Sequence, residues 1–447
     1  MKIFATSTIA ATLSTFLALS RYTQARNLRA PPTLQGAVTV SDLLLDNEYE
    51  EKTSGGGSLL VDTDADVDDI GAIMYLLANT GSSLRGVTVE ADGWSNQWSG
   101  LINIQRTMQQ FGCNNVELAY GVTPGYTILG GNENGQPTTL SGFDGAHYPN
   151  LPDQEYLKPI DSIFTSGCTG FRWAVNPTAA WPYGSTNLLR NAIKSDPGNT
   201  DLVLLGPYSN IAALLQQDPT IIQDIRSVTV SGGYLAWDTQ NDEAPYSYSD
   251  LKPHDSGQNF ELDPNAASFF YAALAKCQQD IAIPKEDRIS GYWYPKSCPR
   301  VQLITSSAQH ELPLATDEEN SRLCGKGCKD SYLGEDILSY YDSLDNCLNE
   351  TDIYYWDQSA AVLSQHSEFC NEWIEEEITV VLESGPAFGT IQNLKDSNGA
   401  TVKICNKVDR DLFLDLYWSP FREGVSTDGE YCLESQPVPI ALMTTSS

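Results

Sequence analysis

Residues 59–69 read LLVDTDADVDD, and this run constrains the chain more than any other. Three apolar residues are followed by five aspartates within eight positions, from Asp62 to Asp69. Carboxylates packed this closely raise one another's pKa and repel one another unless a positive charge offsets them. A divalent cation is the usual offset, and carboxylate oxygens suit a hard cation such as Ca²⁺ or Mg²⁺. The run therefore predicts a metal site.

The spacing around the run predicts a strand, a loop and a helix. Ser58 to Val61 has the length and apolar character of a short buried strand. Residues two apart on an extended backbone face the same way, so Asp62 and Asp64 project together past its end. Asp66 is placed as the N-cap of the helix. Apolar residues then recur at helical spacing, at Ile70, Ile73, Met74, Leu77 and Ala78. The acids therefore lie at the carboxyl end of a strand, where open α/β sheets bind ligands.

Three other interpretations of the run fit less well. An EF-hand loop would need Gly at its sixth position and Glu at its twelfth, where this chain has Val67 and Ile73. A phosphatase of the haloacid-dehalogenase type, with Asp62 as nucleophile and Asp64 as acid, would follow the pattern DxDx[TV]. The fifth position of that pattern is Asp66 here. A helix N-terminus decorated with acids accounts for one or two aspartates rather than five.

The pattern DxDxxxDD before an apolar helix resembles the opening signature of the inosine–uridine-type nucleoside hydrolases, and DTDxDxDD resembles their secreted branch. Later segments resemble the family in the same order and extend the likeness over roughly 58–418: the strand and turn 201–212, the strand 227–233, Asn259 with Asp263-Pro264, Trp356-Asp357, and the closing strand and helix 389–418. The resemblance implies an α/β fold with an open, mostly parallel, Rossmann-like sheet flanked by helices. The alternation of strand-like and helix-like segments favours the same architecture.

The resemblance also implies a metal-assisted mechanism. Asp64 would be both a Ca²⁺ ligand and the general base that activates a calcium-bound water. Asp69 would be the main bidentate ligand, Ser209 would contribute its backbone carbonyl, and Asp357 would close the shell from the far side. Asp68 would contact cation-bound water or a ribose hydroxyl.

The residues expected near the nucleoside depart from the family pattern in three places. Gly257 stands where the family usually has Glu, Asp92 stands where it often has Asn, and Trp356 stands where many members have His. Asp92, Asn259 and Trp356 remain the predicted substrate contacts, Trp356 through stacking on the base. From the residues alone, Asn259 could equally satisfy backbone groups in a loop, and Asp357 could be an N-cap. Without an imidazole before Asp357, the leaving base must be activated by another route.

The function predicted from the sequence is hydrolysis of ribonucleosides to free base and ribose by a secreted, Ca²⁺-dependent enzyme. The alternative is a non-catalytic calcium- or nucleoside-binding protein, or a secreted effector, on the same scaffold. Gly257 and Trp356 motivate that alternative, because each removes a side chain that the reaction uses in the family.

Charge limits the partners of this chain. Lys and Arg number 26 against 58 Asp and Glu, which gives a formal net charge of −32. Binding to nucleic acid or to an anionic membrane needs clustered cations, so neither is expected as a partner. Outside the leader no window offers the ~20 apolar residues of a membrane-spanning helix. A small neutral ribonucleoside suits this composition, and a homodimer is left open.

Composition also indicates how the chain is divided. A single Lys followed by an apolar stretch is typical of a signal peptide, so the protein is expected outside the cell. The segment after it contains RNLR and later YEEK, which resemble the RxLR–EER leader of oomycete effectors, although a basic processing site explains RNLR equally well. The predicted boundaries are 1–25 for the signal peptide, 26–57 for a flexible pro-segment or linker, 58–420 for the hydrolase domain with a Cys-rich insertion around 290–348, and 421–447 for a C-terminal tail.

Ten cysteines favour disulfides, as expected outside the cytosol. A zinc site at Cys324 and Cys328 is less favoured, since no matching pair follows at zinc-like spacing. Asn349 begins the sequon Asn-Glu-Thr and is a predicted glycosylation site. The pattern also predicts a strand at Asp280–Ile283 and irregular structure through 290–348.

Overall fold

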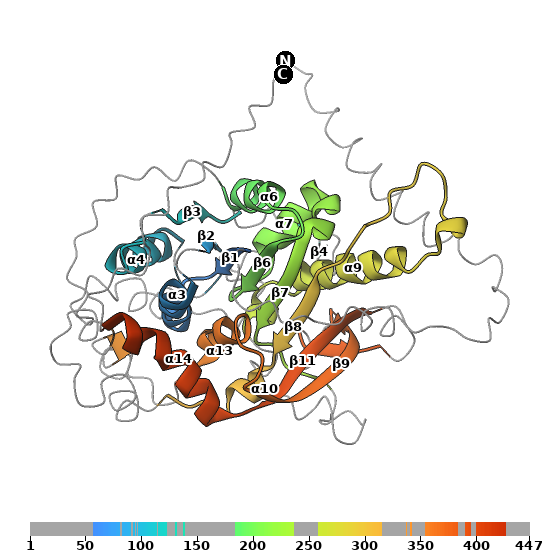
Figure 1. Cartoon of the computed structure of the whole chain (residues 1–447). Helices are drawn as coiled ribbons and strands as arrows, with labels where there is room; N and C mark the ends of the chain where they lie inside the picture. The colour runs from blue at the N-terminus through green and yellow to red at the C-terminus, as the bar shows by residue number, and fades with distance from the viewer. Residues whose placement is uncertain are drawn as a thin grey trace, which may run out of the picture. The chain divides into compact units, whose positions relative to one another are not determined.

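Strand β1 (Ser58–Thr63) lies inside the sheet that organises the molecule (Figure 1). Every residue described below belongs to the unit Ser54–Ser447. The computed structural model describes residues 57–80, 83–90, 93, 95, 97–113, 115–122, 130–131, 137–138, 184–236, 258–314, 337, 340–341, 354–382, 389–394 and 399–425. The predicted signal peptide and glycosylation site lie outside these residues, as does the predicted linker apart from Gly57.

Within the described residues, the main sheet has nine strands and is mostly parallel. Its spatial order is β10 (Ile391–Asn393), β9 (Cys370–Val380), β11 (Ala400–Val408), β8 (Arg300–Ile304), β7 (Ile225–Ser231), β6 (Thr200–Leu204), β1, β2 (Leu84–Val89) and β3 (Glu117–Tyr120). Only β9 runs antiparallel to its neighbours, β10 and β11. Two short strands, β4 (Gly130–Gly131) and β5 (Pro137–Thr138), pair separately. The predicted open, mostly parallel α/β sheet is confirmed.

The strand order reverses direction beside β1. The chain passes from β1 outward to β2 and β3, then returns to β6 on the other side of β1 and continues to β7 and β8. The connections that follow β1 and β6 therefore leave the sheet in opposite directions. A crevice at the carboxyl ends of two such strands is where open α/β sheets bind ligands. The aspartate run begins at this point, since Asp62 and Thr63 are the last residues of β1.

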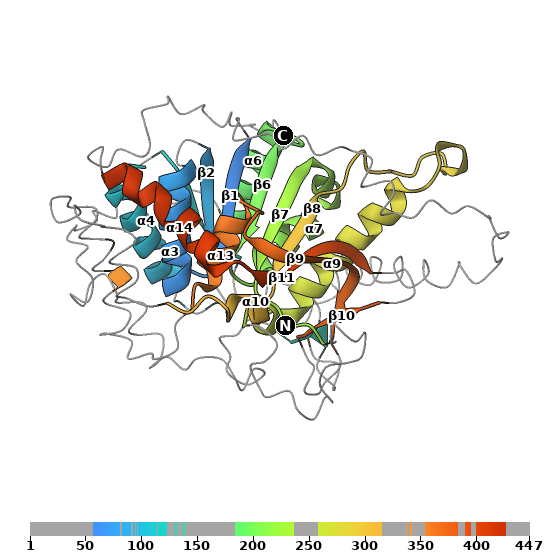
Figure 2. The same ribbon diagram turned by 60° about the horizontal axis from the view of Figure 1, so that its bottom comes forward.

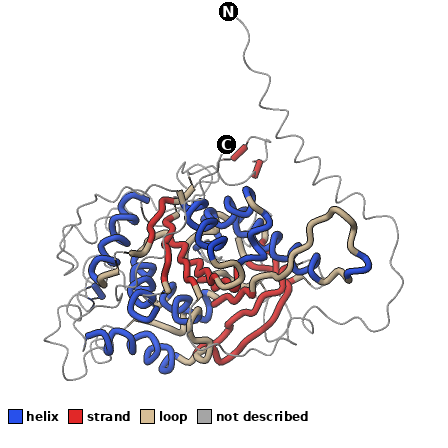
Figure 3. The backbone as a smooth tube through the Cα atoms, turned by 45° about the horizontal axis from the view of Figure 1, so that its top comes forward, coloured by secondary structure: helices blue, strands red, loops and turns tan. Residues whose placement is uncertain are grey.

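Helices cover both faces of the sheet. On one face lie α3 (Val67–Thr80), α4 (Gln97–Gln110), α13 (Trp356–Leu363) and α14 (Arg410–Val425), grouped together in Figure 2. On the other lie α6 (Ser185–Ser195), α7 (Ser209–Gln217) and α9 (Pro264–Ile281). Figure 3 shows the strands running between these helices. Shorter helices are η2 (Pro219–Asp224), α8 (Gln258–Leu262), η3 (Lys285–Asp287) and α10 (Ser306–Gln309).

Successive side chains along the strands point to opposite faces of the sheet and pack into two separate apolar cores. In β1, Leu59 and Val61 join the core under α3, whereas Leu60 joins the core under α7 and α9. A strand buried on both faces must be apolar at successive positions, which is why β1 reads as a continuous apolar run. Each fully buried Leu or Val side chain contributes about 1.5–3 kcal/mol relative to an exposed one. The strand that carries the acids is therefore among the most firmly held parts of the sheet.

The predicted strand at Asp280–Ile283 is wrong. Helix α9 continues to Ile281, and Lys276 donates to Asp280 one turn later at 2.6 Å, which supports the helix there. The strand is instead β8, at Arg300–Ile304, so the region 290–348 is not irregular throughout. Helix α14 runs to Val425, past the predicted domain boundary at 420, and Phe421 is fully buried against Phe111. No helix in the described residues is long and apolar enough to cross a bilayer.

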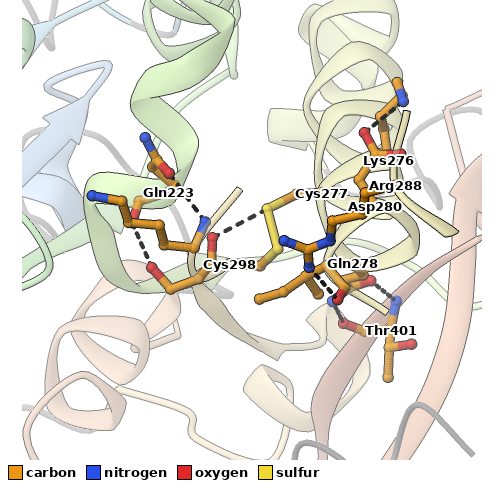
Figure 4. Close-up of a disulfide and its surroundings, with 11 residues drawn as sticks. Gln223, Lys276, Cys277, Gln278, Asp280, Arg288, Cys298 and Thr401 are labelled. Atoms are coloured by element: carbon orange, nitrogen blue, oxygen red, sulfur yellow. Dashed lines mark hydrogen bonds and ion pairs between the residues drawn. A yellow bond between two sulfur atoms is a disulfide. The ribbon is translucent and has the colours of Figure 1, made fainter. Parts of the chain in front are cut away.

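A disulfide fixes the excursion between α9 and β8. Cys277, on α9, is bonded to Cys298, just before β8 (Figure 4). The next residue, Gln278, exchanges two hydrogen bonds with the backbone of Thr401 in β11, at 2.9 and 2.8 Å. The side chain of Arg288, on the excursion, donates to the carbonyl of Ile283 at 3.1 Å. A second disulfide, Cys370–Cys405, links β9 to β11.

Replacing both Cys277 and Cys298 by Ser should lower the free energy of unfolding by about 3 kcal/mol, the chain-entropy value for a loop of ~20 residues. Urea unfolding of the oxidised protein measures this difference. Ser290→Ala, an exposed change in the same excursion, is the control and should shift stability by less than about 0.5 kcal/mol. An unfolding midpoint that is the same with and without the bridge would contradict the prediction.

Candidate active site

The loop after β1 turns sharply at Ala65. This residue has φ of 59°, the only positive φ among the described residues other than glycine. Its N–H donates to the Thr63 hydroxyl at 3.1 Å, and its side chain is fully buried. A non-glycine residue in this region costs on the order of 1 kcal/mol and persists only when its surroundings hold it. The turn places Asp64 between the strand end and the start of α3.

Asp69 occupies the third position of α3 and is held by two donors. The Thr63 hydroxyl donates to its Oδ1, and the N–H of Asp66 donates to its Oδ2 at 3.1 Å. The second bond is the returning half of a capping box, with Asp66 as the N-cap, as the sequence predicts. The carboxylate of Asp69 is therefore fixed before any ligand arrives.

Asp357 reaches the same place from a distant part of the chain. It lies at the second position of α13, and a hydrogen bond with Ser231 at the end of β7 favours its charged form. Gln309 ties this region together, because its amide nitrogen lies 3.0 Å from Ser231 Oγ and 2.8 Å from the carbonyl of Trp356. One carboxylate oxygen each of Asp64, Asp69 and Asp357 lie within 4.8 Å of one another.

All three of these carboxylates are buried, with exposed fractions of 2%, 0% and 4% for Asp64, Asp69 and Asp357. Burial raises the pKa of Asp69 well above its ordinary value, and the charges of Asp357, Asp64 and Asp68 raise it further. Burial and the charges of Asp68 and Asp64 do the same to the pKa of Asp357. Burial, followed by the charge of Asp64, raises the pKa of Asp68 to about 7. Without a proton or a cation to offset their charges, these carboxylates would therefore be unfavourable as anions.

Two glycines permit the close packing around this group. A Cβ at Gly93 would lie 1.9 Å from the Cβ of Asp64, so no side chain fits there. A Cβ at Gly71, on α3, would lie 2.6 Å from the Gln358 amide nitrogen and 2.9 Å from the Tyr341 hydroxyl. Gln358 follows Asp357 on α13, so the missing side chain of Gly71 sets how closely α13 approaches α3. That approach fixes the distance between Asp357 and Asp69.

Asp62 braces the loop from below rather than joining the three acids. Its Oδ1 accepts from Thr88 at 2.5 Å and from the Asn210 amide at 2.8 Å, which joins β1 to β2 and to α7. The N–H of Asn210 in turn donates to Glu90, at the end of β2, at 3.1 Å. Burial raises the pKa of Asp62 to about 6. These contacts make Asp62 a structural brace that joins β1 to β2 and α7.

A family model described as inosine-uridine preferring nucleoside hydrolase matches residues 59–415. The chain belongs to this family. Nucleoside hydrolase 3 of Arabidopsis thaliana is 27% identical over 198 residues, which are 40% of this chain and 21% of that protein. The pyrimidine-specific ribonucleoside hydrolase RihA of Citrobacter koseri is 23% identical over 216 residues, 48% of this chain and 56% of that protein. The matches therefore span less than two thirds of either relative.

Solved structures of nucleoside hydrolases share the fold. The plant nucleoside hydrolase PpNRh1 aligns with a TM-score of 0.53 at 16% identity, covering 82% of this chain and 99% of that chain. The inosine-uridine preferring nucleoside hydrolase from Bacillus anthracis aligns with a TM-score of 0.54 at 18% identity, covering 82% and 100%. At 16–18% identity, these matches establish the fold alone. The function of the site must therefore be argued from the residues of this chain.

The structure gathers part of the predicted nucleoside hydrolase site. Asp64, Asp69 and Asp357 converge, and Asp68 lies beside them, since the backbone amide of Asp357 donates to its carboxylate. The predicted role of Ser209 stays a prediction: its hydroxyl donates to Asp263 at 2.8 Å, and its carbonyl lies in the first turn of α7.

The predicted substrate contacts are placed less completely. The amide of Asn259 donates to the carbonyl of Leu205 at 2.5 Å, so it satisfies a backbone acceptor just past the carboxyl end of β6. Trp356 begins α13 and is half-buried. Asp92 lies outside the described residues. Their roles toward a substrate stay predictions.

Sequence reasoning missed the residues that support the acids from other elements. Ser231 ends β7, Gln309 lies on α10, and the Ser95 hydroxyl donates to the carbonyl of Asp64 at 2.6 Å. The position of Ser231 before a Gly pair at a strand end was the one available signal. For Gln309 and Ser95 the sequence offers none, because their partners are distant in the chain.

The donor set fits a hard divalent cation. Its three side chains are buried carboxylates, and the charges of Asp357 and Asp64 raise the pKa of Asp69, while the charge of Asp64 raises that of Asp357. Calcium binds oxygen at about 2.4 Å, so two ligands on opposite sides of one ion lie about 4.8 Å apart. The spread of the three oxygens, within 4.8 Å, therefore suits a single ion.

Gly71→Ala should weaken cation binding about tenfold or more, because Gln358 and Tyr341 are buried and α13 must move away from α3. Alanine itself favours a helix over glycine by about 0.8–1 kcal/mol, so helix propensity works in the opposite direction. Calorimetric titration of the metal-free protein with Ca²⁺ measures the affinity. Adding Gln358→Ala to this variant removes the clash with Gln358 and should restore part of the affinity; equal affinity in the parent and Gly71→Ala would rule out the spacing argument.

The metal-free protein should lose stability as pH rises from about 4 to 8. The pKa values of Asp62 and Asp68 are raised from 3.8 to about 6 and about 7, so the folded state binds more protons than the unfolded state in this window. Stability is therefore highest below these values and falls as the protons leave. Urea unfolding in chelator at pH 5 and pH 8 tests the sign. Asp68→Asn should flatten the slope, whereas Asp287→Asn, at an exposed position, should leave it unchanged.

Proposed function

We propose that this chain is a secreted, Ca²⁺-dependent nucleoside hydrolase that cleaves the N-glycosidic bond of ribonucleosides to free base and ribose. The observation that carries the proposal is the convergence of Asp64, Asp69 and Asp357, buried, at the strand-order reversal of a nucleoside hydrolase fold. A structural role alone would not require three buried carboxylates from two distant segments to meet.

Asp69 and Asp357 are the carboxylates assigned as cation ligands. Asp69 is oriented by Thr63 and by the N–H of Asp66, so it serves as a fixed ligand. Asp357 is oriented through Ser231 and would supply a further ligand from α13. A Ca²⁺ ion bound by these groups would lower the pKa of an adjacent water and bind sugar hydroxyls.

Asp64 is the residue placed to accept the proton of the attacking water. It lies in the turn between β1 and α3, and Gly93 lies directly against it. As the water attacks C1′ of the ribose, Asp64 takes one of its protons, and the bond from C1′ to the base nitrogen breaks. General-base catalysis of this kind typically contributes 10²–10⁴-fold to the rate.

The substrate class follows from the charge around the site. Without a cation, the clustered acids would repel an anionic sugar phosphate. A neutral ribose avoids this repulsion and can offer its hydroxyls to a bound cation. Asn259 lies in the first turn of α8 with its amide bonded just past the end of β6, and Trp356 begins α13, where its ring would offer an aromatic face to a base. A neutral ribonucleoside therefore suits both parts of the site.

Secretion is supported by the leader sequence and by the disulfides. The apolar stretch after Met1-Lys2 is typical of a signal peptide, and the bonds Cys277–Cys298 and Cys370–Cys405 persist best in an oxidising compartment. Release of the mature protein into the medium of an expressing eukaryotic cell tests this part, with a glycan on Asn349 detected by its loss on glycosidase treatment.

Asp64→Asn should reduce turnover of inosine or uridine at least ~10²-fold, because an amide cannot accept the proton of the attacking water. Ribose release is measured at saturating Ca²⁺, and Ca²⁺ affinity is measured separately by calorimetry. Asp287→Asn, an exposed acid outside the site, is the matched control and should retain full activity.

The same assay separates the enzyme from a non-catalytic binding protein. Parent protein that binds Ca²⁺ yet releases no ribose from a panel of purine and pyrimidine ribonucleosides would support the binding protein and overturn the proposed activity. Turnover that stops in chelator and returns with Ca²⁺ is the result expected of the hydrolase.

A further inference from the structure

Gln309 is a buried amide whose side-chain contacts gather at the start of α13. It ends the short helix α10, which lies next to α13 in Figures 1 and 2, and its side chain is 1% exposed. Its amide nitrogen lies 2.8 Å from the carbonyl of Trp356, 3.0 Å from Ser231 Oγ and 3.2 Å from Ser359 Oγ. Trp356 and Ser359 stand on either side of Asp357 in the sequence of α13, and Ser231 ends β7.

The carbonyl of Trp356 fixes the orientation of this amide. A carbonyl oxygen only accepts hydrogen bonds, so the Gln309 atom that lies 2.8 Å from it must be the nitrogen. That nitrogen carries two hydrogens, and the second is available to Ser231 Oγ at 3.0 Å. Ser231 therefore accepts a hydrogen bond from Gln309 and keeps its own hydroxyl hydrogen for another acceptor.

The acceptor of the Ser231 hydroxyl hydrogen is Asp357. The side chains of these two residues are hydrogen-bonded, and an ionised carboxylate only accepts, so Ser231 is the donor. The hydrogen bonds therefore run in one direction, from the Gln309 amide to Ser231 and from Ser231 to Asp357. Bonds arranged head to tail in this way polarise and strengthen one another. Removal of the amide would free the Ser231 hydroxyl to turn away from the carboxylate.

We propose that Gln309 is a positioning residue that acts through Ser231 to hold Asp357 in the orientation in which this acid binds the cation. The proposal rests on the proposed Ca²⁺-dependent nucleoside hydrolase activity. Residues that orient a metal ligand from behind it typically contribute 10–100-fold to metal affinity. Gln309 would make such a contribution from an element that carries none of the assigned ligands, which is why α10 is tied so closely to the start of α13.

A second glutamine offers the structural comparison. Gln302, on β8, donates to the Thr229 hydroxyl at 2.9 Å and to the carbonyl of Leu363 at 3.1 Å. Thr229 lies on β7 and Leu363 ends α13, so this amide also joins β7 to α13. It does so at the opposite end of the helix from Asp357. Gln302 therefore makes the same type of contact away from the acids.

Gln309→Met replaces the amide by a side chain of similar length and should weaken Ca²⁺ binding about tenfold or more. Gln302→Met is the matched control: it also removes a link between β7 and α13, but it should keep the Ca²⁺ affinity of the parent. Calorimetric titration of the metal-free protein measures affinity, and urea unfolding compares the stabilities. Gln309→Asn keeps an amide that is too short for both contacts, and it replaces Gln309→Met in the test if that variant does not fold.

A double-mutant cycle separates action through Ser231 from independent support of the fold. Ser231→Ala should lower Ca²⁺ affinity about 10–100-fold, and Ser231→Thr, which keeps a hydroxyl, should recover most of that loss. Residues that act in one hydrogen-bond network are not additive, whereas independent residues are. Adding Gln309→Met to Ser231→Ala should therefore change the affinity by less than about twofold.

Three outcomes would overturn the positioning role: unchanged affinity in Gln309→Met, losses that multiply in the double variant, or an equal loss in Gln302→Met. The last would show that any loosening of α13 is sufficient. Ribose release from inosine tests the proposed function separately. A parent that shows this pattern of Ca²⁺ affinities yet releases no ribose would overturn the hydrolase and leave the positioning of Asp357 standing. A parent that binds no Ca²⁺ would overturn both.

Discussion

The repulsion between buried carboxylates at the end of β1 is the constraint on which the rest of the site depends. Asp64, Asp69 and Asp357 are removed from water and lie close together; the charges of Asp357 and Asp64 raise the pKa of Asp69, and the charge of Asp64 raises the pKa of Asp357. Holding them together in the absence of a cation uses part of the small net stability of a folded domain. The surrounding structure must therefore hold their positions firmly. It does so through the buried strand β1, the capping box at the start of α3 and the close contact between α3 and α13.

Helix geometry offsets part of this repulsion. Asp69 lies in the first turn of α3 and Asp357 in the first turn of α13, where unpaired N–H groups and the helix dipole favour negative charge. The N–H of Asp357 donates to the carboxylate of Asp68, so the start of one helix caps an acid of the other. Each such contribution is typically 0.3–1 kcal/mol, which is less than the cost of burying an unpaired carboxylate. Helix ends therefore orient the acids but offset only part of the cost of burying them.

The sequence was sufficient wherever the determining contacts are local. The strand, loop and helix around Asp64 follow from residue spacing, because alternation along a strand and the 3.6-residue period of a helix act over few residues. Asp357 was placed by family resemblance alone, since its approach to Asp69 depends on Gly71 and Gln358 packing across two helices far apart in the chain. β8 was missed for a related reason. Five residues ending in an apolar pair carry little signal, and the apolar end of α9 imitates a strand until the Lys276–Asp280 pair shows the helix continuing.

The acids and the residues beside Asp357 differ in burial, and this difference determines which of them can be replaced at little cost in stability. The cation end rests on β1 and the first turns of α3 and α13, which are packed against both apolar cores and tolerate little change. Beside Asp357, the rings of His310, Tyr354 and Trp356 contact one another and are at least partly exposed. Replacing a residue there disturbs few buried neighbours. The link through Gln309, whose amide nitrogen lies 2.8 Å from the carbonyl of Trp356, still holds this cluster beside Asp357, so its side chains can change while the acids keep their places.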